Sequence, residues 1–213
     1  MAVIADVTAG TPITPTWGNS IRDQVVATCT SSTRPTGSEG RLIYETDTDK
    51  VMVYNGTDWR EVYSDGGFTT ATTTLTASVT DPTLGTGSFS GVRYQKIGRR
   101  VVGNMMIRFG SSGAAAGSGF YVPGLPVSPV NYTTLFGVPH FIGHGMMKDN
   151  STGAVMGAAL QIGTSGIVTI VCMAQNPTDG TNRVGSTVTN TVPWTWAADD
   201  VVFNGTFSYE AAS

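Results

Sequence analysis

The sequence predicts a mainly β protein, in which a short N-terminal helix and a small β-meander precede a C-terminal antiparallel β-sandwich of jelly-roll type. Only 13% of the residues are charged, against about 25% in an average soluble domain. Short runs of β-forming residues alternate with Gly, Pro, Asn and Asp along most of the chain, and a helical period occurs only near the N-terminus. The helical N-terminal segment is expected at 1–30, the meander at 40–63 and the sandwich at 75–213.

The segment 11–30 carries the helical pattern. Thr16 or Asn19 is the expected N-cap, and two prolines prevent an earlier start. A helix of about three turns is marginal by itself in water, so its apolar face needs a partner. The meander, a second copy of the chain or another protein could provide it. The residues of this face recur at four-residue steps: Trp17, Ile21, Val25 and Cys29.

The segment 40–63 predicts a three-stranded meander. Residues 42–44 and 51–54 are rich in β-formers and are separated by a polar turn. Asn55-Gly56 follows directly and predicts a tight hairpin, since both central residues of such a turn need positive φ. The returning strand is then 59–63. The flanking segments 31–39 and 64–74 are predicted to be linkers.

The meander is expected to assemble with other copies of itself. Alternation places Val51 and Val53 on one face and Met52 and Tyr54 on the other, so both faces carry apolar side chains. Segments below about 40 residues usually need disulfides, metals or oligomerisation to fold, and this one contains neither Cys nor His. Of these three means of stabilisation, only oligomerisation remains for this segment. The predicted interface consists of Trp17, Ile21, Val25, Val51, Val53, Tyr54 and Trp59.

The C-terminal part contains short β-runs at fairly regular spacing and no helical period. Turn residues separate these runs, and such spacing indicates a sandwich or jelly roll. The predicted strands are 75–79, 91–97, 100–109, 119–122, 135–142, 155–162, 167–174 and 201–209.

Composition excludes several classes of partner. The net charge is −3, and the basic residues are scattered except at Arg99 and Arg100, so no nucleic acid partner is expected. No run approaches the roughly 20 apolar residues of a membrane span, and 1–10 lacks the features of a secretion signal. We therefore expect no membrane insertion and synthesis in a cytoplasm. Cys29 and Cys172 are expected to be buried, reduced thiols.

Two histidines are the candidates for a metal site or a general base. On an extended chain the four-residue step from His140 to His144 places both on one face, near Asp149. Zinc sites normally have three or four ligands, which favours surface or loop histidines instead. No metal and no cofactor are therefore expected.

Trp194 and Trp196 are candidates for glycan binding, together with His140. Aromatic side chains beside the carboxylates of Asp199 and Asp200 suit a sugar, although tryptophans at alternate positions before a strand are more often part of a core or an interface. The motifs G-x-S-x-G, G-x-x-x-x-G-K-[ST] and H-E-x-x-H do not occur. No catalytic residue is identified, and the chain is not expected to be an enzyme.

Four stretches of the sequence resemble minor tail and tail-fibre (fibre-tip) proteins of tailed phages, especially those of actinobacteria. These stretches are "WGNSIRDQVV", "GRLIYETDTDKVMVYNGTDWREV", "GVRYQKIGRRVVGNMMIRF" and "VPWTWAADDVVFNGTFSYEA". The central stretch 111–193 matches no family motif. The resemblance implies a non-enzymatic homotrimer that takes part in host attachment or virion decoration.

The resemblance also implies an arrangement of the parts. The N-terminal segment would dock on other virion proteins, the meander would trimerise, and the sandwich would face the host surface and its glycans. The protein would be assembled in the host cytoplasm and reside in the virion at the tail tip or fibre. A head-attached capsid fibre or decoration protein is the alternative, and a glycan-cleaving tailspike, which would need paired carboxylates, is the enzymatic rival.

Overall fold

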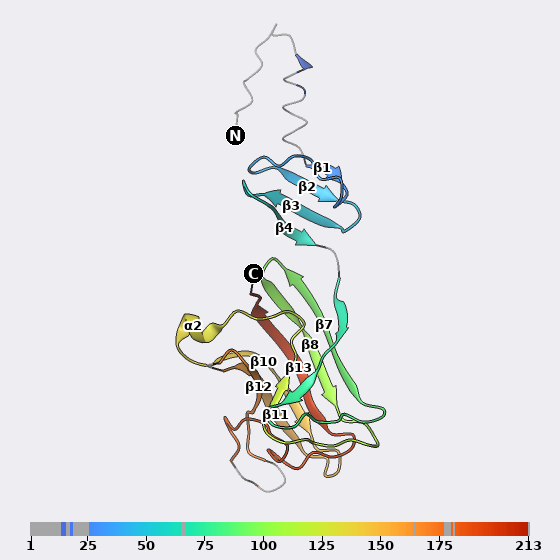
Figure 1. Cartoon of the computed structure of the whole chain (residues 1–213), viewed down its shortest axis with the longest axis vertical. Helices are drawn as coiled ribbons and strands as arrows, with labels where there is room; N and C mark the ends of the chain where they lie inside the picture. Colours follow the sequence, from blue (N-terminus) through green and yellow to red (C-terminus); the bar gives the residue numbers. More distant parts are fainter. Residues whose placement is uncertain are drawn as a thin grey trace. The chain divides into compact units, whose positions relative to one another are not determined.

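The structure is a computed structural model that describes residues 14, 15, 18, 26–64, 67–163, 165–176, 180 and 182–212. It divides into two compact units, Met1–Gly67 and Phe68–Ser213, and both are built mainly from β-strands (Figure 1). The predicted β class with antiparallel sheets is confirmed. Most of the predicted helix, with Trp17, Ile21 and Val25, lies outside the described residues.

The described residues of the N-terminal unit form one four-stranded sheet. Strands β2 (Leu42–Glu45), β3 (Lys50–Tyr54) and β4 (Trp59–Ser64) form the antiparallel meander that the sequence predicts. A further strand, β1 (Ala27–Cys29), pairs in parallel with β2. Cys29 was expected at the end of a helix, and that expectation is wrong. Its carbonyl accepts the Thr46 N–H at 2.9 Å, so pairing with the free edge of β2 decides its conformation.

The loop between β3 and β4 lies where the sequence predicts it but differs in type. It has four residues, 55–58, rather than a two-residue Asn-Gly turn. The Asn55 side-chain oxygen accepts the N–H groups of Thr57 and Asp58 at 3.0 and 2.8 Å, and Gly56 has a φ of 93°. Asparagine thus caps a longer loop, because its side chain imitates a backbone acceptor.

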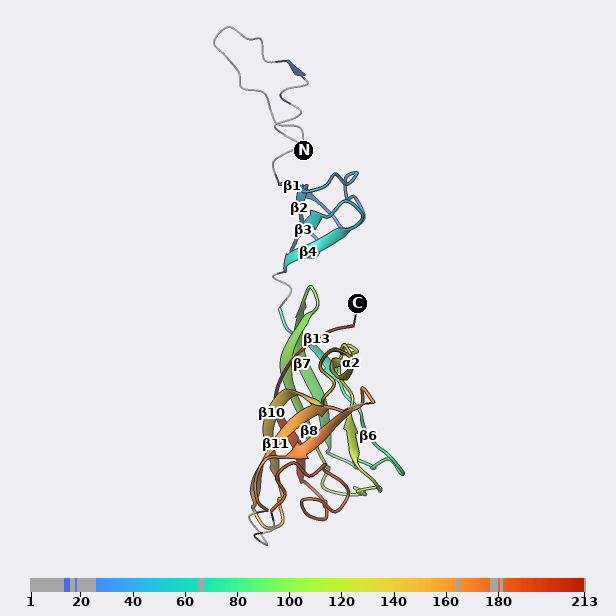
Figure 2. The same ribbon diagram turned by 90° about the vertical axis from the view of Figure 1, so that its left-hand side faces the viewer.

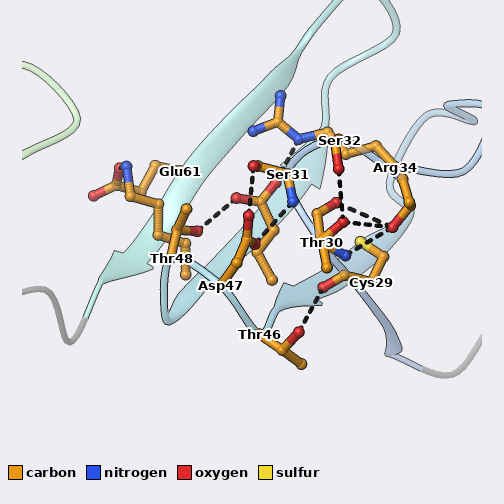
Figure 3. Close-up of polar contacts among 12 residues, drawn as sticks. Cys29, Thr30, Ser31, Ser32, Arg34, Thr46, Asp47, Thr48 and Glu61 are labelled. Carbon is orange, nitrogen blue, oxygen red and sulfur yellow. Dashed lines mark hydrogen bonds and ion pairs between the residues drawn. The ribbon is translucent and has the colours of Figure 1, made fainter.

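The predicted linker 31–39 is instead part of the N-terminal unit. Arg34 forms an ion pair with Glu45, and Gly37 lies so close to the Tyr54 ring that a Cβ would overlap it. The Ser31 N–H and hydroxyl donate to Asp47 at 2.8 and 2.6 Å (Figure 3). This segment covers one face of the sheet, where Ile43 and Met52 are buried.

The C-terminal unit is organised around a seven-stranded antiparallel sheet. The predicted linker 64–74 contains the edge strand β5, so that expectation is wrong for residues 69–72. The order across the sheet is β12 (Val168–Cys172), β11 (Val155–Ile162), β10 (His140–Lys148), β13 (Val201–Glu210), β8 (Arg100–Arg108), β7 (Phe89–Ile97) and β5 (Thr69–Thr72).

A second, smaller layer covers one face of this sheet. Strands β6 (Leu75–Ala77) and β9 (Tyr121–Pro123) pair with each other, and Figure 2 shows β6 to one side of the long strands. The core lies between these layers. Tyr121 packs against Trp196 with ring centroids 6.1 Å apart, and Phe109 lies 6.5 Å from the same indole. Two packed antiparallel layers are consistent with a β-sandwich.

The predicted strand 135–142 is wrong in its first half. The helix α2 (Tyr132–Phe136) occupies this part, and β10 begins at His140. Gly137, with a φ of 72°, lies between the two elements and changes the chain direction. The prediction 155–162 matches β11 to the residue, and 201–209 matches β13 to within one residue.

Phe207 shows how the two faces of the large sheet differ. Its partners in the neighbouring strands are Gly103 and Gly143, which leave room for the ring on the core face. A Cβ on Gly103 would lie 2.8 Å from Phe207 Cζ. The alternate residues Thr206 and Ser208 point to the opposite, outer face and are exposed. The outer face is where the candidate site lies.

Candidate functional site

The outer face of the seven-stranded sheet is hollowed into a groove of about 730 Å³. Its floor consists of short and medium side chains, and larger apolar side chains stand around it. We call this feature the outer-face groove. Its lining is Phe68, Val102, Gly103, Asn104, Phe141, Ile142, Gly143, His144, Ala159, Met173, Thr206, Phe207 and Ser208.

A row of polar side chains crosses the groove. His144 in β10 pairs with Thr206 in β13, and Thr206 pairs with Asn104 in β8. Residues directly opposite each other in adjacent strands have their side chains on the same face, about 5 Å apart. Ser208 lies two residues beyond Thr206 on that face. The row therefore offers an imidazole, an amide and two hydroxyls to the groove.

A β-bulge in β10 determines which side chains reach the groove. Phe141 pairs with Gln161, but the next pair is Gly143 with Leu160, so one residue is inserted. The insertion places Phe141 and His144, which are three residues apart, on the same outer face. In a regular strand an odd step would put them on opposite faces.

The same bulge separates His140 and His144, the two candidate metal ligands. His140 pairs with the core residue Ile162, whereas His144 faces outward, so the two imidazoles lie on opposite faces. The buried Asp149 accepts the Ser151 hydroxyl at 2.6 Å and serves a turn. Among the described residues, no group of three or more potential ligands could hold a metal ion.

Phe68 lies at the side of the groove opposite Phe141, and a cation–π contact holds its ring in place. The Arg93 guanidinium carbon lies 4.9 Å from the centre of its ring. Arg93 pairs with Asn104 in the neighbouring strand, so it continues the polar row toward the sheet edge. About half of the Phe141 side chain, 51%, is exposed. Phe68 is 45% exposed, so two aromatic rings are accessible at the groove.

The predicted glycan-binding residues are not brought together. Trp194 and Trp196 are buried in the core cluster with ring centroids 5.4 Å apart, and the Trp196 Nε1–H donates to the Thr189 carbonyl at 2.7 Å. Neither ring can serve as a sugar platform. His140 is exposed but stacks on Tyr132 at 4.7 Å and does not line the groove.

The carboxylate beside these tryptophans has a structural role. Asp200 is fully buried and accepts the N–H groups of Asn150 and Ala197 at 2.8 and 2.7 Å. Burial raises its pKa above the ordinary value, and the two backbone donors oppose that shift. Asp200 thus joins two loops and does not face a ligand.

The cysteines are both free. Cys172 is buried as expected, and burial raises the pKa of its thiol to about 11. Cys29 is only half-buried, which corrects the expectation of a buried thiol. Its pKa is also raised, first by burial and then by the nearby Glu45 charge. Neither thiol is therefore a thiolate nucleophile at neutral pH.

The N-terminal sheet leaves its second face open, and we call this surface the open face. Leu42 and Arg60 pair with Val53, and Tyr44 and Tyr63 pair with Val51, so these six side chains share the open face. Leu42 is 38% exposed and Tyr63 is 54% exposed. In the neighbouring bulge of β4, Val62 is also exposed. The described residues of the unit do not cover this apolar surface.

The predicted oligomer interface is therefore divided between two faces. Val51 and Val53 lie on the open face, as the alternation predicts. Tyr54 and Trp59 lie on the other face, where their rings pack edge to face with centroids 5.4 Å apart. The segment 31–39 covers that face, so these two rings already have partners within the chain.

An ion pair joins the segment 31–39 to the sheet on the face that this segment covers. The Glu45 side chain is fully buried and accepts hydrogen bonds from Arg34 Nε and from the Thr48 hydroxyl, the latter at 2.7 Å. The Arg34 hydrogen bond holds the pKa of Glu45 below its ordinary value, and burial opposes it. The charge is thus compensated, which makes the segment 31–39 an integral part of this unit.

Sequence reasoning missed the outer-face groove. The alternation Asn204, Thr206, Ser208 in "VVFNGTFSYE" indicates a polar outward face of one strand. The neighbours of this strand in the sheet, β8 and β10, come from distant parts of the chain. Phe68 lies in the stretch predicted as a linker, and no local signal marks the bulge at Phe141. The groove therefore follows from strand order.

The chain matches no family model, no curated protein and no solved structure. Within the described ranges, none of the helices has the length and apolar character that crossing a membrane requires.

Proposed function

We propose that this chain is a structural protein of a phage virion, a tail-associated fibre or minor tail protein that takes part in host attachment. The N-terminal unit assembles three copies, and the N-terminal segment docks on other virion proteins. The C-terminal unit, which we assign to the jelly-roll type of sandwich, is directed to the host surface. The sequence resemblance to phage fibre-tip proteins supports this proposal.

The open face of the N-terminal sheet carries the assembly part of the proposal. Its exposed side chains include Leu42 and Tyr63, Val51 and Val53 lie between them, and Tyr44 and Arg60 lie beside them. An apolar surface on so small a unit is costly in water unless it is covered, because apolar burial contributes about 25 cal/mol per Å². A second copy of the same sheet offers a surface of the same chemistry, which favours a homo-oligomer.

The composition of the groove and the burial of two carboxylates favour a role in host attachment over cleavage of a glycan. Retaining and inverting glycosidases use two carboxyl groups about 5 to 10 Å apart at the sugar. No Asp or Glu is among the described residues that line the outer-face groove. Asp149 and Asp200 are buried and bonded to backbone N–H groups. A tailspike enzyme is therefore the weaker proposal.

The test is to locate the chain in phage particles that contain it. Three copies around the tail tip or a tail fibre are the expected result. Density for the chain on the capsid surface would instead favour a head-attached fibre or decoration protein. If mass spectrometry of purified particles lacks its peptides while the infected cell contains them, the virion proposal fails.

A further inference from the structure

We propose that the outer-face groove binds an uncharged glycan, with one sugar ring stacked on Phe141 and sugar hydroxyls bonded to Asn104, Thr206 and Ser208. The inference concerns the C-terminal unit alone. It rests on the proposed function only for the source of the glycan, the host surface.

The chemistry of the groove matches a sugar on two sides. A pyranose presents apolar C–H groups on its ring faces and hydroxyls around its rim. Aromatic side chains at the groove, Phe141 and Phe68, offer flat apolar surface to the ring faces. The polar row beneath them provides the donors and acceptors that hydroxyls need, because an amide and two hydroxyls can each do both.

The polar side chains of the floor are available to a ligand. No side-chain hydrogen bond joins Asn104, Thr206 or Ser208 to another described residue, and all three are exposed. Burying such groups under an apolar partner would cost about 1–3 kcal/mol for each one left unpaired. A hydroxyl-rich ligand avoids this cost, which is why a glycan fits better than an apolar peptide.

The absence of charge in the groove selects the class of glycan. The described lining residues include no Lys, Arg, Asp or Glu. Sulfated, phosphorylated or sialylated ligands bring anions whose desolvation needs a cationic partner. Arg93 pairs with the lining residue Asn104, and its guanidinium lies on the Phe68 ring. Uncharged hexose or N-acetylhexosamine units therefore suit the groove.

The bulge in β10 is what makes the site possible. It brings Phe141 to the same face as His144 and hence beside the polar row. The aromatic ring comes from β10, the hydroxyls from β13 and the amide from β8, and these strands are adjacent, so the rigid sheet positions all of them. Single groove sites of this kind bind weakly, and several copies on one particle would raise the avidity.

The experiment uses the full chain on an array of uncharged oligosaccharides of hexoses and N-acetylhexosamines, with sialylated and sulfated counterparts. Hits are measured by calorimetry. Phe141→Ala should weaken binding about tenfold, in line with the loss of one stacking contact. Thr206→Val keeps the shape, removes the hydroxyl and should weaken binding about fivefold.

A matched control is available in the same sheet. Phe89 is exposed to the same extent as Phe141, 51%, but does not line the groove. Phe89→Ala should leave the dissociation constant within twofold of the wild type. The open-face variant Val53→Asp should keep the single-site affinity even if it changes the number of copies, so failure of the assembly proposal is recognised separately.

Three results would overturn the inference. Wild-type protein that binds no uncharged glycan at millimolar concentration would refute it. A preference for the sialylated or sulfated counterparts would assign the groove to another ligand. Equal losses in Phe141→Ala and Phe89→Ala would show that binding occurs elsewhere.

Discussion

Removal of the Arg34 side chain tests the account of the N-terminal unit most quantitatively. In Arg34→Ala the buried Glu45 carboxylate keeps only the Thr48 hydroxyl as a side-chain donor. Breaking a buried ion pair by removing one partner costs about 3–5 kcal/mol. The Arg34 side chain is 36% exposed while that of Glu45 is 1% exposed, so water can replace part of the lost contact. We expect a loss of about 3 kcal/mol.

Hydrogen exchange followed by mass spectrometry of the full chain measures this loss. Peptides from β2 and β3 should exchange about 100-fold faster in Arg34→Ala, since about 1.4 kcal/mol corresponds to a factor of ten. Peptides from β8 and β13 in the other unit should be unchanged. Arg60→Ala is the control, because Arg60 and Asp58 are 64% and 60% exposed and such pairs contribute below about 1 kcal/mol.

Exchange in Arg34→Ala within twofold of the wild type, or an equal effect of Arg60→Ala, would contradict this prediction. Either result would mean that Glu45 is not buried behind the segment 31–39.

Three further predictions concern stability. The pKa of Glu45 is lower in the folded state than in the unfolded state. The ionised Glu45 side chain therefore stabilises the fold above the unfolded-state pKa, and this contribution is lost as pH falls through the folded-state pKa. Hydrogen exchange of β2 measured against pH should show the loss, and Glu45→Gln should abolish this pH dependence. Gly103→Ala should lower the free energy of unfolding by about 2 kcal/mol in a urea titration, because its Cβ would lie 2.5 Å from a backbone oxygen, whereas Gly157→Ala, with its nearest atom at 3.4 Å, should be nearly neutral. Asp200→Ala should cost about 2–4 kcal/mol in the same titration, because it leaves two backbone N–H groups unpaired.

Strands with a clear apolar run or a clear alternation could be predicted from the sequence. The run 155–162 is apolar and ends at glycine on its C-terminal side, and it forms β11 to the residue. The alternation in 51–54 predicted that Val51 and Val53 share a face of the meander. These features follow from the two-residue period of a strand, which the sequence displays directly.

Features that depend on distant partners were not predictable in this way. The parallel pairing of β1 with β2 determines the conformation of Cys29, although Cys29 also continues the helical period of the preceding segment. The segment 31–39 has the composition of a linker, yet Arg34 finds its partner eleven residues further on. A bulge has no local signature in "HFIGHGMMK", although it decides the direction of Phe141 and His144.

Aromatic residues show the same limit. Trp194 and Trp196 stand beside carboxylates in the sequence, which suggests a sugar site, but the fold turns both indoles into the core. The accessible rings, Phe68 and Phe141, are separated by more than seventy residues and meet only through the order of the strands. Which aromatic side chains remain exposed is a property of the sheet and not of the local sequence.

Light scattering on the purified chain at micromolar concentration tests the central claim, that the open face joins copies of this protein. We predict three times the chain mass of 22.3 kDa for the wild type and for the loop control Thr57→Asp. Val53→Asp should give a single chain mass, with or without loss of the N-terminal fold, since burying its charge between copies costs several kcal/mol, roughly, even with Arg60 opposite it in β4. A wild-type mass of one chain, or an unchanged assembly in Val53→Asp, would contradict the account.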